Sequence, residues 1–361
     1  MEFALSADQR MLQESVDRTL ARACPLQRIR KLPADKSVAK DVWAALAELG
    51  IAGILIPEAH GGSGLTLLDA ALVSEMLGRH VAPAPFAATA VVAPLALLHA
   101  GSPAQQTEWL PKLASGKTLA GIAISERIAG ARDGAGVTAS NGKLDGKALF
   151  VIAAGAPLCV VADRDGGLHL VHTASPGVTH IPLETIDVTR PPGELQFDNV
   201  EAEPLNSGDA RAAFAKIRDA GWTMLAADTL GASQRMIEKA VEYAKERQQF
   251  GRVIGSFQAV KHLCAEMAAE LEPCRALVWY AAHAFDAIPA EAALTAAHAK
   301  AHTSEIGRFV ARTATEVHGG IGFTDLLGLH YWFKRIGLNR QLLGGPDRVR
   351  HLAAQMQGFA A

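Results

Sequence analysis

Apolar residues recur at helical spacing through the first part of the chain. Met11, Val16 and Leu20 recur near helical spacing in the segment after Ser6, and the segments VWAALAELG and LLDAALVSEMLGRH continue the pattern. Gly50 and Gly78 lie at or near the ends of these two segments, where glycine often terminates a helix. The pattern predicts a helical domain over residues 1–118.

The pattern changes at about residue 119. Short runs rich in valine and threonine, such as LCVVA and GVTHIPLE, are separated by the pairs NG, DG and GG. Such pairs are typical of the turns that join antiparallel strands. We therefore expect a compact β domain over residues 119–204.

Residues 205–361 return to helical spacing over long runs. Apolar side chains form one broad face between residues 222 and 246, and a second face starts at residue 257. Antiparallel bundling is the simplest way to bury such faces. The sequence thus predicts an α+β fold, mostly α, whose C-terminal domain is a helical bundle. The two faces contain Leu225, Ala226, Leu230, Ile237, Val241 and Ala244, and then Phe257, Val260, Cys264, Met267 and Leu271.

Composition and charge exclude several classes of protein. The 361 residues include 49% hydrophobic and 20% charged residues, and the formal net charge of −2 favours neither nucleic acid nor an anionic membrane. The uncharged stretch 81–98 contains three prolines and many alanines, so it predicts a buried core helix and no membrane span. The N-terminus lacks the basic and apolar segments of a secretory signal, and the four cysteines show no CxxC spacing. These features predict a cytoplasmic protein with reduced thiols.

Several motifs carry little chemical information. The glycine-rich segments 57–66 and 318–324 lack the order of a Rossmann nucleotide site, and there is no G-x-S-x-G elbow of a hydrolase. His298 and His302 have the four-residue spacing of a metal pair. They lack a third ligand and the central glutamate of a zinc protease, so we predict a structural or surface pair and no metal site.

The segment 246–262, ERQQFGRVIGSFQAVKH, is the most informative. Arg247, Phe250 and Gln258 follow the end of a long helix. A guanidinium can neutralise a diphosphate, while an aromatic ring and an amide can contact an adenine. An ordinary helix–turn–helix corner explains the same residues equally well.

Four segments together indicate a family. FALSADQRML, PEAHGGSGL, YAKERQQFGRVIGSFQAVKH and EVHGGIGFT occur in the order and spacing of the acyl-CoA dehydrogenases, and the resemblance covers essentially the whole chain. It implies three domains, with FAD between the β domain and the bundle. It also implies a tetramer, either homomeric or formed with a paralogous subunit, and an electron-transfer protein as acceptor.

The resemblance further assigns residues to the cofactor. Residues of the β domain match positions beside the flavin ring, namely Ile124, Ser125 and Glu126 on a strand and Phe150 as the aromatic side chain near it. Residues of the bundle match positions that contact the FAD of the neighbouring subunit. These are Arg247, Gln249, Phe250, Ile254, Phe257 and Gln258, followed by Glu316, Gly319 and Gly320.

The implied chemistry needs a carboxylate that this sequence lacks at the usual places. In the family a carboxylate removes the α-proton of an acyl-CoA thioester while the β-hydrogen leaves as hydride to the flavin. The two positions that can hold this base match Gly344 and Gly221. Asp228 lies two helical turns after Gly221 in an apolar run, which makes it a candidate substitute base. The alternative is a structural aspartate paired with Arg235 or Arg247.

Three functions remain open at this stage. The first is FAD-dependent α,β-dehydrogenation of an acyl-CoA, with a bulky or unusual acyl group indicated by the HGGIGFT wording. The second is a catalytically incomplete subunit of a heteromeric dehydrogenase, favoured by Gly221 and Gly344. The third is a flavin oxidase or monooxygenase on the same fold.

Overall fold

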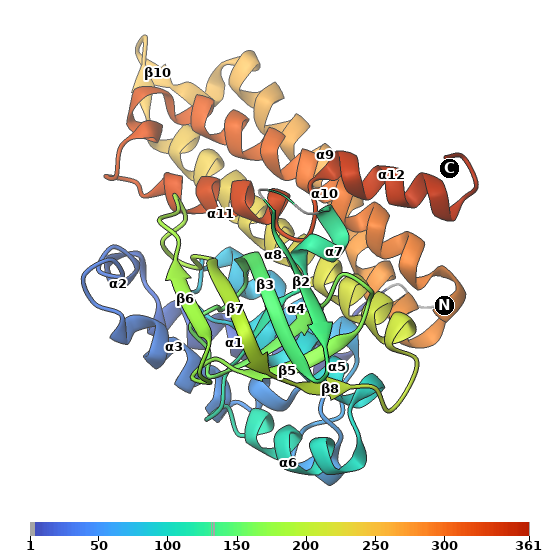
Figure 1. Ribbon diagram of the computed structural model, residues 1–361. Helices are drawn as coiled ribbons and strands as arrows, with labels where there is room; N and C mark the ends of the chain where they lie inside the picture. Colours follow the sequence, from blue (N-terminus) through green and yellow to red (C-terminus); the bar gives the residue numbers. More distant parts are fainter. Residues whose placement is uncertain (1–3, 131, 133, 361) are drawn as a thin grey trace.

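The computed structural model describes residues 4–130, 132 and 134–360, so the outermost residues of the two expected helical domains, 1–3 and 361, lie outside the described residues. Helices surround a β region at the centre of the chain (Figure 1). The helices of the N-terminal region are α1 (Ala7–Ala23), α2 (Leu26–Ile29), α3 (Ser37–Glu48), α4 (Leu67–Arg79), α5 (Ala93–Ala100) and α6 (Pro103–Ala114), with short turns η1 (Ile51–Gly53) and η2 (Glu58–His60) and a π-helical turn η3 (Ala87–Val92).

Side-chain caps fix where the N-terminal helices begin. The Ser6 hydroxyl accepts the backbone N–H of Gln9, and the Gln9 side chain accepts the N–H of Ser6 in return. Thr66 with Asp69 forms the same reciprocal cap at α4. Each pair satisfies two backbone donors that a helix start leaves free, which explains why the polar residues stand there.

The two glycines expected at helix ends have different roles. Gly50 has φ of +76° and follows α3, as predicted. Gly78 lies inside α4, where a Cβ would stand 1.8 Å from the Asp228 carbonyl oxygen of α8 (Ala210–Glu246). The expectation of a C-terminal glycine was wrong at this position: Gly78 is needed because α4 and α8 touch backbone to backbone. Gly231 serves the same contact from α8, against the Glu75 carbonyl oxygen.

The β region consists of two four-stranded sheets. One has the order β1-β4-β5-β8 and the other the order β2-β3-β7-β6, and apolar side chains of both form a separate core between them. Asn141 and Gly142 have φ of +51° and +76° in the turn that joins β2 to β3, as the Asn-Gly pair predicts. The strands are β1 (Ala120–Ala123), β2 (Gly136–Ser140), β3 (Lys143–Val151), β4 (Leu158–Ala162), β5 (Leu168–His172), β6 (Val178–Pro182), β7 (Gly193–Glu201) and β8 (Glu203–Leu205), and α7 (Ser125–Ala129) follows β1.

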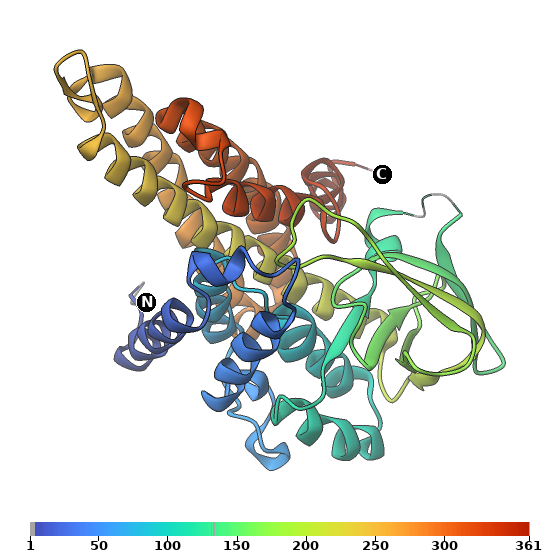
Figure 2. The ribbon, with the colours of Figure 1, turned by 90° about the vertical axis from the view of Figure 1, so that its left-hand side faces the viewer.

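Long helices form the C-terminal bundle. α8, α9 and α10 pack on one another, and α8 also packs on α4. Figure 2 shows the N-terminal helices and the β region on opposite sides of one half of the bundle, while the other end projects freely. The remaining elements are the strand pair β9 (Gln248–Gln249) and β10 (Arg252–Val253), η4 (Ile254–Ser256), α9 (Gln258–Ala287), α10 (Pro289–His318), η5 (Gly319–Phe323), α11 (Leu329–Gln341) and α12 (Pro346–Met356).

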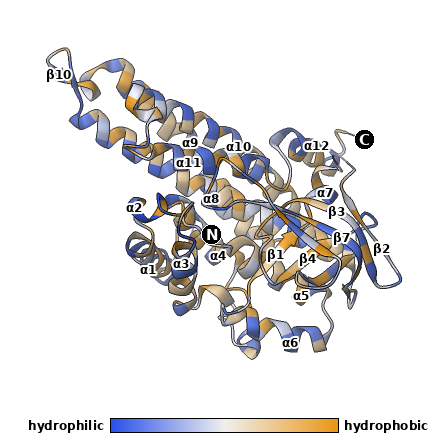
Figure 3. Ribbon diagram, turned by 60° about the vertical axis from the view of Figure 1, so that its left-hand side comes forward, coloured by the Kyte–Doolittle hydropathy of each residue, from blue (hydrophilic) through white to orange (hydrophobic). Residues whose placement is uncertain are grey.

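The uncharged stretch 81–98 is a core segment, as predicted. It forms η3 and most of α5, and its side chains are buried apart from those of Pro85 and Leu98, which are half-buried. Among the described residues, no helix is both long and apolar enough to cross a membrane. The hydrophobic strand β1 reaches this interior beside β4 (Figure 3). The expected α+β fold, mostly helical, is therefore confirmed.

Candidate active site

An apolar cavity of about 370 Å³ lies between the β region and the bundle. The β region contributes α7, the end of β3 and the loop after β6, and the bundle contributes the end of α11 and the segment that follows it. The cavity is lined by Ser125, Glu126, Ala129, Gly130, Arg132, Leu149, Phe150, Ile186, Gly337, Leu338, Gln341, Leu342, Leu343, Gly344 and Gly345.

Two of the lining residues, Ser125 and Phe150, have side chains that are available to a bound molecule. The Ser125 hydroxyl is buried, and its Oγ has no hydrogen-bond partner among the described residues. Phe150 has φ of +52°, beside a register shift between β3 and β7, and remains 43% exposed. A buried hydroxyl without a partner is costly, so Ser125 Oγ is free to pair with a polar group from outside the chain.

The structure changes the expected placement of the segment 124–126. Ser125 and Glu126 lie in the short helix α7 and not on a strand, because β1 ends at Ala123. Ile124 precedes this helix, is fully buried, and is not one of the residues that line the cavity. Ser125, Glu126 and Phe150 are therefore brought together at the cavity.

Glu126 is the one carboxylate among the described lining residues. Its Oε1 accepts the backbone N–H of Leu149 at 2.5 Å, which ties α7 to the end of β3. Burial raises the pKa of Glu126, and backbone hydrogen bonds from Leu149 and from its own N–H oppose that rise. The carboxylate thus holds a wall of the cavity in place.

Both glycines at the expected base positions border this region. Gly344 lines the cavity with φ of +98°, a backbone conformation that other residues rarely adopt. Gly221 lies in α8, where a Cβ would stand 2.7 Å from Leu343 Cδ1. The Leu343 carbonyl also accepts the Trp222 Nε1–H at 2.7 Å. The segment after α11 is therefore closed against α8 at the point where a carboxylate would have to emerge.

Asp228 lies in a buried polar network. It is fully buried and is not among the residues that line the apolar cavity. Its Oδ1 accepts Arg335 Nε at 3.1 Å and Asn339 Nδ2 at 2.6 Å, and Arg190 Nη1 lies 3.5 Å from its Oδ2. The alternative hypothesis, a structural aspartate, named Arg235 or Arg247 as its partner. The structure pairs Asp228 with Arg335 and Arg190 instead. These contacts hold the carboxylate between helices, outside the lining of the apolar cavity, while its Oδ2 accepts no hydrogen bond from the described residues.

Arg335 connects Asp228 to the rest of the molecule. Its Nη1 donates to Thr189 Oγ1 at 2.8 Å in the loop between β6 and β7. Its Nη2 donates to the Ala82 carbonyl at 2.7 Å in the N-terminal region. One fully buried guanidinium therefore joins the N-terminal helices, the β region and the bundle.

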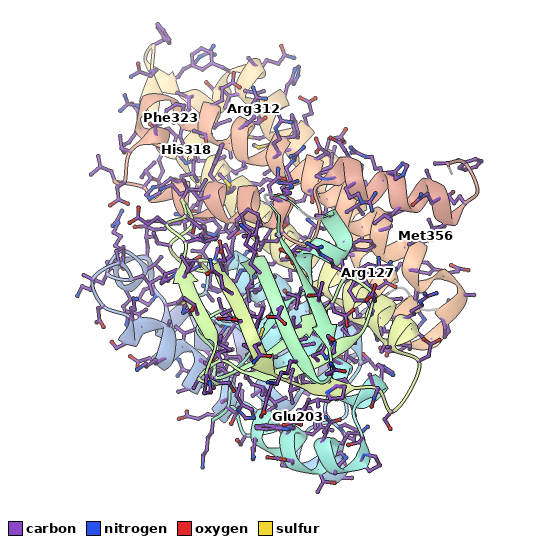
Figure 4. The ribbon with its side chains drawn as sticks, in the orientation of Figure 1. Arg127, Glu203, Arg312, His318, Phe323 and Met356 are labelled. Carbon is purple, nitrogen blue, oxygen red and sulfur yellow. The ribbon has the colours of Figure 1, made fainter. Side chains whose placement is uncertain are left out.

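The other expected cofactor residues gather at the free end of the bundle. The Tyr243 and His318 rings stack at 4.8 Å, which brings the end of α8 next to the end of α10. Figure 4 shows His318 and Phe323 together at this end. Most of the set are exposed there, with Phe250 at 93%, while Ile254 and Phe257 are half-buried. The set comprises Arg247, Gln249, Phe250, Ile254, Phe257, Gln258, Glu316, Gly319 and Gly320.

The two groups of expected residues are separated within one chain. α11 runs from the free end towards the cavity, and its 13 residues span roughly 20 Å at 1.5 Å per residue. The exposed aromatic and basic groups at the bundle end therefore lie apart from the cavity of the same chain.

Sequence reasoning missed one side of the cavity. Gly337, Leu338 and Gln341 of α11 line it, as does Ile186 from the loop after β6. Their spacing on α11 is that of one helix face, so the sequence did contain a signal for this wall of the cavity.

His298 and His302 are both exposed, which fits the prediction of a surface pair. The described residues hold no group of three or more potential metal ligands.

Comparison with known proteins identifies the family. Residues 6–117 match the model "Acyl-CoA dehydrogenase, N-terminal domain", and residues 219–357 match "Acyl-CoA dehydrogenase, C-terminal domain". The chain belongs to the acyl-CoA dehydrogenase family. It is accordingly an oxidoreductase of the acyl-CoA dehydrogenase type, and the expected family membership is confirmed.

Individual known proteins and solved structures resemble this chain over nearly its full length. Acyl-CoA dehydrogenase IpdE2 of Mycobacterium tuberculosis is 33% identical over 344 residues, which are 95% of each chain. A variant of the "Tcur3481-Tcur3483 steroid ACAD" has a TM-score of 0.87 at 30% identity, covering 97% of this chain and 98% of the other. The ChsE4-ChsE5 complex of M. tuberculosis has a TM-score of 0.88 at 26% identity, covering 100% of both chains.

Proposed function

We propose that this chain is one subunit of a heteromeric, FAD-dependent acyl-CoA dehydrogenase whose catalytic base is supplied by a paralogous partner. One observation carries the proposal. Glycines occupy both positions that match the family's base, and Leu343 closes the space at Gly221. Asp228, the substitute that the sequence offered, is tied to Arg335 and Asn339.

The cavity suits a flavin ring. The Ser125 hydroxyl can pair with a polar ring atom, and Phe150 can pack beside the ring. Bound FAD supplies an acceptor for the hydride that leaves the β-carbon. The protein's part at this site is to orient the ring and to keep water away from it, which the mainly apolar lining favours.

The free end of the bundle suits the FAD of a neighbouring subunit. Arg247 can neutralise a diphosphate, and Phe250 and Gln258 can contact an adenine. These side chains are exposed and are therefore accessible to a second chain. A dimer is the smallest assembly in which one chain's bundle end meets the other's cavity, and a tetramer is two such pairs.

Glu126 does not replace the missing base in this proposal. Its carboxylate borders the cavity, but Oε1 is occupied by the Leu149 N–H. We therefore assign Glu126 a positioning role at the junction of α7 and β3.

The acyl group is proposed to be bulky. The steroid ACAD variant at 30% identity supports this class, and its name joins two designations, Tcur3481 and Tcur3483.

We further propose that an electron-transfer protein reoxidises the flavin. The caffeyl-CoA reductase-Etf complex subunit CarC, a relative at 29% identity, is named as part of such a complex.

The proposed compartment is the cytoplasm. The four free cysteines fit its reducing conditions.

Expression alone and with a paralogue tests the proposal. The chain alone is expected to hold little flavin and to leave it oxidised when acyl-CoAs are added without oxygen. The heteromer is expected to show a flavin spectrum that bleaches with a bulky acyl-CoA. Bleaching by the chain alone would overturn the heteromeric assignment. Flavin that reacts with oxygen but never with an acyl-CoA would instead indicate an oxidase or monooxygenase.

A further inference from the structure

Lys300 is a fully buried lysine on α10 that does not line the apolar cavity. Among the described residues its amine meets only carbonyl and hydroxyl oxygens. Lys300 Nζ donates to the Asn339 carbonyl at 2.5 Å and to the Arg340 carbonyl at 3.2 Å, and Ser304 Oγ lies 3.4 Å away. Taking an amine out of water is costly, so a lysine here requires a role that an apolar side chain could not fill.

The two carbonyls belong to the last turn of α11. The last four carbonyls of a helix have no partner within that helix, and in α11 these are the carbonyls of residues 338–341. The Leu342 N–H donates to the Leu338 carbonyl at 3.1 Å, and Lys300 supplies the donor for the next two carbonyls. Lys300 therefore caps α11 from the neighbouring helix, and a cation at a helix C-terminus is also favoured by the helix dipole.

The segment that follows the capped turn is strained. Leu343 has φ of +55° and Gly344 has φ of +98°. A left-handed backbone is unfavourable for leucine, and it persists only where the surrounding structure holds it. Trp222 Nε1 donates to the Leu343 carbonyl at 2.7 Å and holds the segment from α8. The capped turn of α11 holds it from the preceding residues.

The same segment forms one wall of the apolar cavity. Residues 342–345 line the cavity, together with Leu338 and Gln341 of the last turn of α11. The segment joins α11 to α12 beside α7 (Figure 1). A shift of the capped turn therefore moves this wall towards or away from the β region.

We infer that Lys300 is a positioning residue for the apolar cavity: it fixes the last turn of α11 and thereby the wall that residues 342–345 form. It acts through α11 and not by contact with a bound molecule. The inference rests on the proposed function for what the wall orients, a flavin ring beside Ser125 and Phe150. A lysine that only supported the bundle would affect all of its helices alike, whereas a positioning lysine acts on this turn in particular.

Hydrogen exchange of the purified protein, followed by mass spectrometry, tests the inference without flavin. In Lys300→Met the amides of residues 340–342 are expected to exchange about 10-fold faster than in the wild type, the loss of a hydrogen bond that holds the turn. The amides of α9 are expected to change less. Lys300→Gln, whose amide ends one bond short of the carbonyls, is the second variant and is expected to loosen the same turn.

Val278→Ala is the matched control. Val278 is fully buried on α9, so its truncation lowers stability through lost packing and leaves the contacts of Lys300 intact. It should not single out residues 340–342. Unchanged exchange at residues 340–342 in both Lys300 variants, or an equal change over the whole bundle, would overturn the inference and leave the proposed function standing.

Flavin retention by the heteromer gives a second readout. Flavin is expected to dissociate several-fold faster from the Lys300→Met heteromer, and at nearly the wild-type rate from the Val278→Ala heteromer. Equal acceleration in the two variants would reduce Lys300 to a structural role. Faster exchange at residues 340–342 with unaltered flavin dissociation would support the positioning of the wall and contradict the proposed flavin site in this cavity.

Discussion

Leu343 fills the place beside Gly221 that a side chain would need. Its Cδ1 lies 2.7 Å from where a Cβ would stand, and its carbonyl accepts the Trp222 indole N–H. Glycine at position 221 therefore does more than remove a carboxylate. It lets the segment after α11 pack directly on α8, and this packing can be measured.

Gly221→Ala is expected to destabilise the protein by about 1–3 kcal/mol, because the new methyl group overpacks against Leu343. Leu343→Ala alone costs about 2–5 kcal/mol through the lost packing. The double variant is expected to be more stable than the sum of the two, as denaturant unfolding of the four proteins will show. Gly337→Ala on α11 is the control, since a Cβ there meets no atom within 4 Å. Additive losses would contradict the packing.

Asp228→Asn is expected to lower the free energy of unfolding by about 3–5 kcal/mol, because it leaves the buried Arg335 and Arg190 without their shared carboxylate. Thermal unfolding measures the loss. Glu266→Gln, on the exposed side of α9, is expected to change stability by less than about 0.5 kcal/mol. A stable Asp228→Asn variant that has lost only flavin reduction would restore Asp228 as the base.

Lys300 makes stability depend on pH. Burial, and then the Arg340 charge, lower the pKa of Lys300 from 10.5 to about 7. Between pH 7 and 10 the unfolded chain holds a proton at this site that the folded chain has lost, so the free energy of unfolding rises with pH over that window. Lys300→Met is expected to remove this rise, while Lys245→Met, at an exposed site, keeps it. Identical slopes in both variants would rule out this role of Lys300.

Ser125→Ala is expected to weaken flavin binding up to about tenfold, the loss of one neutral hydrogen bond. Flavin dissociation from the heteromer, followed by fluorescence, measures the change. Ser140→Ala on the exposed part of β2 should have no effect. Unaltered dissociation in Ser125→Ala would mean that the buried Oγ does not face the cofactor.

Arg247→Ala/Phe250→Ala separates stability from assembly. Both side chains are exposed in the single chain, so its melting temperature should not change. The flavin retained by the heteromer should fall at least severalfold, because the bundle end then lacks its cation and its ring. Arg22→Ala provides the matched exposed substitution. Full flavin retention would contradict a role of the bundle end at the neighbouring site.

The sequence predicted the fold well because its signals are local. Helical spacing and reciprocal caps such as Ser6 with Gln9 act over a few residues, and the Asn141-Gly142 pair sets a turn by itself. Gly78 was misread for the same reason. Its role depends on the carbonyl of Asp228, 150 residues away, and nothing in its own neighbourhood reveals that contact.

The candidate site was only partly predictable. Residues that belong to motifs, such as Ser125 and Phe150, could be named and are brought to one cavity. The partners of Asp228 could not, since Arg335 is more than 100 residues away and looks like any charged residue on a helix.

Arg335 has a further consequence for how the chain unfolds. Its guanidinium is bound at once to α8, to the loop after β6 and to the Ala82 carbonyl. Detaching any one of these regions leaves a donor of the buried guanidinium without its acceptor, which couples the stability of the three regions. The chain should therefore unfold in a single cooperative transition. A partner that binds the free end of the bundle should also stabilise the N-terminal helices and the β region.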